Sequence, residues 1–529
     1  MRHLTFFRRA AVLSSAAALA LGCGAQSGDS EDRFPGGAGA GPSTGSGGTG
    51  AFGTKCPDCN ALGDNEEGRA AISDDTQFAA SGAGGGQLTN PSTAPACAGI
   101  SNTPKRLESA LGSGSSLASA TLTRGLISMG KAPLPQHVRT QDLLNYFPPS
   151  FATTNTPANG DSTAPQVVVE LAKRAVGGDI TGATDYDLLV AVQAPTSQTN
   201  DSPDVLIVLD TTPSMSEGLE RAKSAAVTLV QKLPVASQIR VRTSDSATDL
   251  RAAAGASRDE LISELQQISL LEDERPFALT LDGAYADSAL RPGGRVFVLT
   301  DGADDPLTIA ADAIVAGANQ DVVINGLAFA PPDEHGDRFF RALAWLGRGH
   351  YAFIDTDTEA ESVLSQHLPA MLGTELQDVR VALSLPWHFK NVPRDTEELL
   401  ELDGGSNKPQ NMGPAAVGSF LYQLRTCDST LVNTNLGDEI TVTVRYRRDG
   451  SDFIELPLTL KVAELLKSPN QRVVRAAAIY TYAESLKTLD AKRLVHAMAT
   501  LDSAASATGD TPLQGLSALL SQHPLLSAP

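Results

Sequence analysis

Acids and hydroxyls follow two strongly apolar stretches of this chain at a spacing that suits metal binding. Asp210 comes directly after five apolar residues, and Thr212 and Ser214 follow it at alternate positions. Asp301 ends a second such stretch, in the sequence Thr-Asp-Gly. Carboxylate and hydroxyl oxygens are the ligands that a hard cation such as Mg²⁺ prefers. The pattern therefore predicts a site for a divalent cation.

Two buried strands must position these residues. The runs 205–209 and 296–300 are apolar at successive positions, which is typical of strands covered on both faces in a parallel sheet. Open α/β sheets bind ligands at the edge where the carboxyl ends of their strands lie. We therefore expect Asp210 and Asp301 to converge at that edge.

The surrounding region, about 203–375, alternates strand-like and helix-like segments. Apolar residues recur at three- and four-residue spacing between 219 and 233, which predicts an amphipathic helix. Further helices are expected over 259–271, 281–290, 337–346 and 359–372, and further strands over 322–329 and 350–354. This order predicts a Rossmann-like, doubly wound and mostly parallel sheet.

Beyond residue 376 the apolar period changes to two, which predicts antiparallel strands with one buried face. Such strands are expected over 379–385, 440–446 and 453–460, and similar segments at 167–171 and 188–192 precede the α/β region. We expect these strands to form a β-sandwich with the α/β module inserted in it. Residues 463–529 are predicted to be helical.

The residues after the first strand resemble the von Willebrand factor type A domain and its metal-ion-dependent adhesion site. The family motif Asp-x-Ser-x-Ser is matched by Asp210-Thr-Thr212-Pro-Ser214, and the family's later acid is matched by Asp301. The resemblance implies that Ser214 and Thr212 contact Mg²⁺ directly and that the aspartates act directly or through water. It also implies that an acidic residue of a protein partner completes the coordination.

This sequence departs from the family pattern at two positions. Thr212 replaces a serine and still offers a hydroxyl oxygen. The threonine that the family supplies from an intervening loop is replaced by Arg275 in the register we favour, and Thr280 could substitute only if that loop shifts. An arginine would repel a cation or replace its charge. A working site and a sheet that has lost its metal are therefore both open.

The resemblance extends to a family of bacterial type A lipoproteins, over about 110–529. Val138-Arg139 and Asn145-Tyr-Phe147 match the segment upstream of that family's domain, and the β-rich and helical C-terminal extension is shared. The organisation we expect is a signal peptide over 1–22, a lipid-anchored tether over 23–104, an N-terminal segment with sandwich strands over 105–202, the type A domain over 203–375, the sandwich over 376–462 and a helical region over 463–529.

The N-terminus has the pattern of an export signal. Basic residues precede the apolar run 10–21, and Leu19-Ala-Leu-Gly-Cys23 resembles a bacterial lipobox. The resemblance implies cleavage before Cys23 and acylation of this residue, with Gly24 favouring the outer membrane. An ordinary signal peptide with an incidental cysteine is the alternative. Residues 36–53 are nearly all Gly, Ser, Ala, Thr and Pro, which predicts a flexible tether.

Composition narrows the function further. The net charge of −20 argues against nucleic acid as a partner, because phosphates would be repelled. Cys56 and Cys59 match only half of a zinc ribbon, so a disulfide involving this pair or Cys97 is the favoured expectation, whereas Cys427 lies far away in sequence. We expect a membrane-anchored binding module and not an enzyme. The alternatives are a metal-independent scaffold and a hydrolase that uses the C-terminal region.

Replacement of Cys23 by Ala tests the predicted anchor. Two or three acyl chains hold a protein stably on a membrane, so Cys23→Ala should move the protein from the membrane fraction to the soluble fraction. Fractionation followed by immunoblotting measures this change. Continued membrane association of the variant would contradict lipidation at this cysteine.

Overall fold

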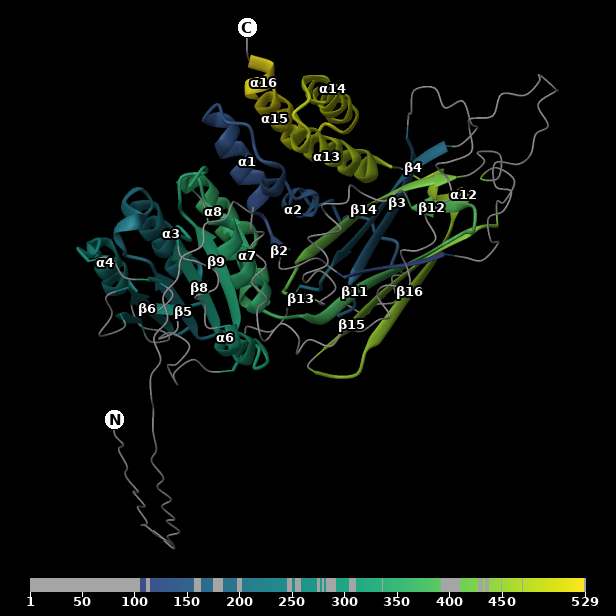
Figure 1. Cartoon of the computed structure of the whole chain (residues 1–529). Helices are drawn as coiled ribbons and strands as arrows, with labels where there is room; N and C mark the ends of the chain where they lie inside the picture. The colour runs from purple at the N-terminus through teal and green to yellow at the C-terminus, as the bar shows by residue number, and fades with distance from the viewer. Residues whose placement is uncertain are drawn as a thin grey trace, which may run out of the picture. The chain divides into compact units, whose positions relative to one another are not determined.

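The computed structural model describes most of the chain after residue 104 (Figure 1). The described residues are 105–110, 115–156, 163–174, 184–196, 202–244, 250–252, 258–273, 276–277, 280–281, 292–303, 311–334, 336–391, 410–426, 432, 437–448, 450–468 and 470–527. Cys23 and the other four cysteines, Arg275 and the predicted helix beyond residue 281 lie outside them.

A seven-stranded sheet forms the α/β module. Its strands, in spatial order, are β2 (Ser115–Ser116), β10 (His350–Phe353), β9 (Val323–Ala328), β8 (Arg295–Thr300), β5 (Val205–Leu209), β6 (Ile239–Thr243) and β7 (Leu250–Ala252). All neighbouring pairs are parallel except β6 and β7. Every residue of β5 and β8 is buried, as the apolar runs predicted.

Helices cover both faces of this sheet. One face packs against α3 (Leu219–Lys232), α4 (Asp259–Gln267), α8 (Asp357–Gln366) and α9 (Leu368–Leu372), and the other against α1 (Ala118–Ser128), α6 (Ala311–Ala318) and α7 (Asp337–Leu346). The Rossmann-like fold class is therefore confirmed. The single helix expected over 359–372 is wrong, because it divides at His367 into α8 and α9. Pro369 explains the division, since it has no N–H to continue the helical ladder.

Two antiparallel sheets form the β-sandwich. One has the order β12 (Phe389–Asn391), β14 (Val417–Thr426), β4 (Thr184–Gln193) and β3 (Gln166–Lys173). The other has the order β1 (Lys105–Ala110), β11 (Leu376–Leu385), β15 (Glu439–Arg447) and β16 (Ile454–Lys461), and β13 (Gln410–Met412) also pairs with β11. The inward-facing residues of both sheets share one apolar core. Strands from before and after the α/β module pair directly, with Leu189 opposite Leu421, so the module is inserted in the sandwich.

One histidine is buried beside the sandwich core. The side chain of His388 is fully buried, and its Nε2 hydrogen-bonds to Asp438. Tilted contact with the ring of Phe389 places it beside the sandwich core. The apolar neighbours Trp387 and Phe389 were the signal in the sequence for this burial.

The C-terminal helices are α12 (Val462–Leu465), α13 (Gln471–Lys487), α14 (Ala491–Thr508), α15 (Thr511–Leu520) and α16 (Pro524–Ser527). The side chains of Asp490 and Asp510 cap the N-termini of α14 and α15, and Gly509 ends α14 in the left-handed conformation. Apolar residues of α13, α14 and α15 share a core with α2 (Thr140–Tyr146). Among the described residues, no helix is both long and apolar enough to span a bilayer.

The N-terminal segment contributes to more than the sandwich. Besides sandwich strands, it supplies β2 to the α/β sheet, α1 to one face of that sheet and α2 to the helical core. The short helix η4 (Pro135–His137) joins α1 to α2. Sequence analysis missed this role, because β2 has only two residues and carries no apolar pattern.

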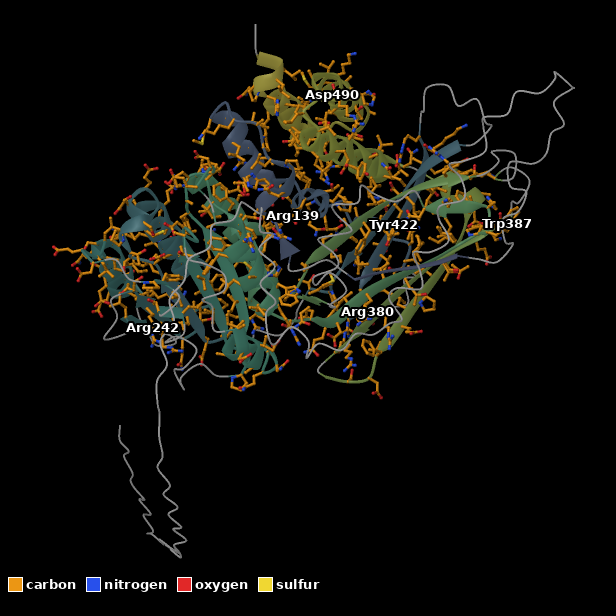
Figure 2. The ribbon with its side chains drawn as sticks, viewed as in Figure 1. Arg139, Arg242, Arg380, Trp387, Tyr422 and Asp490 are labelled. Atoms are coloured by element: carbon orange, nitrogen blue, oxygen red, sulfur yellow. The ribbon has the colours of Figure 1, made fainter. Side chains whose placement is uncertain are left out.

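Arg139, whose side chain is 13% exposed, joins this segment to the α/β module through ion pairs (Figure 2). Arg139 donates to Asp142 at 2.7 Å and to both carboxylate oxygens of Asp337 at 2.9 and 3.0 Å. Ser116 also donates to Asp142, and Tyr351 to Asp337. One guanidinium therefore neutralises two buried acids, one from each side of the contact.

Removal of this charge should be costly. Arg139→Gln leaves Asp142 and Asp337 buried without their cation, so we expect a loss of about 3–5 kcal/mol in the free energy of unfolding. Arg493 is exposed on α14, and Arg493→Gln is the control, with an expected change within about 0.5 kcal/mol. Urea unfolding followed by circular dichroism measures both. Similar values for the two variants would contradict a clamp at Arg139.

Candidate metal centre

Asp210 lies at the end of the central strand and is almost fully buried. It is 1% exposed, and its backbone N–H donates to the carbonyl of Leu299 on the neighbouring strand β8. Its Oδ1 accepts from the amide and hydroxyl of Thr212 at 2.9 and 2.7 Å, and from Ser244 Oγ at 3.3 Å. Its Oδ2 accepts from Thr300 Oγ1 at 2.5 Å. Both oxygens are thus fixed by short polar side chains.

The two hydroxyls of the motif lie together beside this carboxylate. Thr212 Oγ1 and Ser214 Oγ are 3.0 Å apart. Pro213 begins the short helix η5 (Pro213–Glu217), which turns the chain so that the alternate residues Thr212 and Ser214 face the same place. Because Thr212 donates its hydroxyl hydrogen to Asp210, Ser214 is the donor to Thr212, and one lone pair of Thr212 Oγ1 remains for a cation.

Asp301 is at the same edge of the sheet. It directly follows β8, whose Leu299 is the register partner of Leu209 on β5. It is 7% exposed, and its Oδ1 accepts from the amide of Ala303. Gly302 has a φ of +74°, which lets the chain turn sharply after the acid. The expected convergence of the two strand ends is therefore observed.

The electrostatic environment of Asp210 suits a positive ligand. Burial raises the pKa of its carboxyl, hydrogen bonds from Thr300 and Thr212 lower it, and the charge of Asp301 raises it. Within the described part of the chain, the partners of Asp210 are hydroxyls and backbone amides, not basic side chains. A buried carboxylate is costly without a nearby positive charge. The residues therefore fit a hard cation.

This centre depends on hydroxyls more than on acids. The described residues contain no cluster of three or more His, Cys, Asp or Glu side chains able to hold a metal. Asp210, Thr212, Ser214 and Asp301 offer two carboxylates and two hydroxyls instead, a donor set for Mg²⁺ and not for a soft metal.

Thr280 and Arg275 are the two other residues that the sequence raised for this site. Thr280 is described and half-buried, but no described hydrogen bond links it to Asp210, Thr212 or Ser214. Arg275 lies outside the described residues. Its position relative to the carboxylates stays a prediction.

Sequence analysis missed two residues that hold Asp210 in place, Ser244 and Thr300. Ser244 follows β6, the neighbour of β5, and also accepts from the amide of Thr211 at 3.0 Å. Thr300 is the last residue of β8. Both lie at the carboxyl ends of strands next to β5, so the available signal was a polar residue ending each neighbouring strand.

Comparison with known proteins gives weak but consistent likenesses. No protein-family model matches the sequence. "Uncharacterized protein YfbK" of Escherichia coli (strain K12) is 25% identical over 276 residues, which are 49% of this chain and 47% of that protein. The chain therefore spans about half the length of the curated relative it matches.

Among solved structures, "von Willebrand factor type A from Catenulispora acidiphila" is 16% identical, with a TM-score of 0.41, and the match covers 68% of this chain and 90% of that one. Proximal thread matrix protein 1 of the mussel byssus, solved with a zinc-occupied metal-ion-dependent adhesion site (MIDAS) motif, is 13% identical over 31% of this chain and 44% of that one, with a TM-score of 0.25. The sheet order and the polar residues at the strand ends are those that the resemblance to von Willebrand factor type A domains led us to expect.

A methyl group at Gly302 should disturb the centre. A Cβ there would lie 2.6 Å from the ring of Phe340, in addition to the strain of a positive φ. Gly509 has a similar φ of +72° but open space around its Cβ, so Gly509→Ala measures the strain alone. We expect Gly302→Ala to lower the free energy of unfolding by about 1–3 kcal/mol more than Gly509→Ala does. Equal losses in the free energy of unfolding, measured by urea unfolding, would show that the ring of Phe340 can move aside without cost.

Proposed function

We propose that this protein is a binding module that uses Asp210, Thr212, Ser214 and Asp301 to hold Mg²⁺. A single observation carries the proposal: a buried carboxylate is surrounded by hydroxyls, two of which lie 3.0 Å apart at the edge of a parallel sheet. The bound cation would supply a positive charge with which an acidic residue of a protein partner can combine. The proposed activity is binding and not catalysis.

Each residue of the candidate centre has a different role in holding the cation. Thr212 and Ser214 present their hydroxyl oxygens, and Asp210 accepts a hydrogen bond from Thr212 so that this hydroxyl keeps a fixed orientation. Ser244 and Thr300 hold the two oxygens of Asp210 from either side. Asp301 adds negative charge at the same edge. The arrangement is formed before any ligand arrives, which lowers the entropy lost on binding.

We further propose that the module acts at the outer membrane of the bacterial cell envelope, as a lipoprotein attached through Cys23. The basic and apolar N-terminal run that ends at Cys23 supports this location. The Gly- and Ser-rich segment before residue 104 would let the module reach partners away from the membrane surface.

A metal-independent scaffold is the second candidate. The presence of Arg275, where the family has a threonine, favours it. A guanidinium that pairs with Asp210 or Asp301 would satisfy the buried charge without an ion. The two candidates differ in what the protein does when Mg²⁺ is removed.

Thermal unfolding with Mg²⁺, Mn²⁺ or EDTA distinguishes them. A ligand at a hundredfold excess over its Kd stabilises the folded state by about 2.7 kcal/mol, so Mg²⁺ should raise the melting temperature of the wild-type protein. Asp210→Ala should abolish this increase. Asp312 is an exposed acid of the same module, and Asp312→Ala should keep it.

The alternative outcomes are equally definite. No increase in the wild-type protein, together with a Mg²⁺-dependent increase in Arg275→Thr, would show that the arginine has replaced the ion. No increase in either protein would refute a metal at this centre. An increase that survives in Asp210→Ala would place the ion elsewhere.

A further inference from the structure

Arginines gather on the outer face of the five-stranded sheet of the sandwich. Arg380 on β11 and Arg445 on β15 are register partners, and Arg447 follows two positions along β15. Their neighbours Val379, Val444 and Tyr446 face the core, so these arginines face outward (Figure 2 labels Arg380). On its other side, Arg445 has the acid Glu455 of β16 as its register partner. We call Arg380, Arg445 and Arg447 the arginine patch.

An aromatic ring orients two members of the patch. The guanidinium carbons of Arg445 and Arg447 each lie 3.9 Å from the centroid of the Phe453 ring. Two cations cannot share one face of a ring at that distance, so they occupy opposite faces. Stacking fixes the plane of each guanidinium and leaves its edge, which carries the N–H donors, free to meet another group.

The acids near these two arginines do not hydrogen-bond to them. Asp378 Oδ2 lies 3.5 Å from Arg447 Nε, and Glu455 Oε1 lies 3.9 Å from Arg445 Nε. Among the described residues, both Nε atoms are buried without a hydrogen-bond partner. By contrast, Arg472 meets Glu170 at 2.6 Å. The two acids thus lie at ion-pair distance without hydrogen-bonding, and the side chains of Arg445 and Arg447 remain 42% and 38% exposed, so a ligand from solvent can reach them.

We propose that the arginine patch binds an oxyanion of the phosphate class. Planar guanidinium groups match the oxygens of phosphate with paired, charge-assisted hydrogen bonds, and stacked arginines lose little further freedom when they form them. The patch lies on strands of the sandwich and not on the α/β module, so it is separate from the candidate metal centre. Its ligand is either free phosphate or the phosphate of a lipid headgroup.

Binding is tested on the full chain carrying Cys23→Ala, so that acyl chains cannot cause membrane association. The first measurement is isothermal titration with inorganic phosphate, with chloride at the same ionic strength as reference. The second is co-sedimentation with vesicles of phosphatidylglycerol and, separately, phosphatidylcholine. The test variant is Arg445→Gln/Arg447→Gln. The control variant is Lys492→Gln/Arg493→Gln, which removes the same charge from exposed positions on α14.

We expect the test variant to bind phosphate at least about tenfold more weakly than the control variant, because it loses hydrogen bonds to a charged ligand. Sedimentation with phosphatidylglycerol vesicles that the test variant loses would identify lipid phosphate as the source. Phosphate binding without sedimentation would identify free phosphate. The proposal is overturned if the parent protein binds neither probe, or if the two variants bind equally.

Discussion

The burial of one carboxylate at the end of a central strand constrains the α/β module. Asp210 can be buried only if its charge is compensated, and the described compensation consists of hydroxyls from three neighbouring strand ends. These hydroxyls require β5, β6 and β8 to lie side by side and parallel, so that their carboxyl ends coincide. The burial of Asp210 therefore requires both this order of parallel strands and the hydroxyl residues at their ends.

Much of this arrangement follows from local sequence. Continuous apolar runs identify β5 and β8, and the parallel sheet then brings Asp210 and Asp301 to one edge. Alternating apolar residues identify β11, β15 and β16, since each has one face on the sandwich core. In these elements neighbouring residues in the sequence determine which positions are buried, so the strands can be predicted from the sequence alone.

Other features depend on pairs that are distant in sequence. The ion pair between Arg139 and Asp337 joins residues 198 positions apart, and neither has a local pattern that names its partner. Ser244 is one polar residue among several after β6, and only the packing of β6 beside β5 selects it. Pro369 was a signal that the helix expected over 359–372 divides at His367, but the apolar residues on both sides of it favoured one continuous helix.

The N-terminal segment and the candidate metal centre both contact the stretch that contains Pro332 and Gly336. Gly125 on α1 approaches Pro332 so closely that a Cβ would lie 2.7 Å from the proline ring. At the other end of this stretch, the amide of Gly336 points to the carbonyl of Asp301, and a Cβ on Gly336 would meet Gly302 at 1.8 Å. Because both contacts lack room, α1 and the turn after Asp301 constrain the same stretch from opposite ends. The segment before the α/β module thus belongs to the support of the centre, although it is far from the centre in sequence.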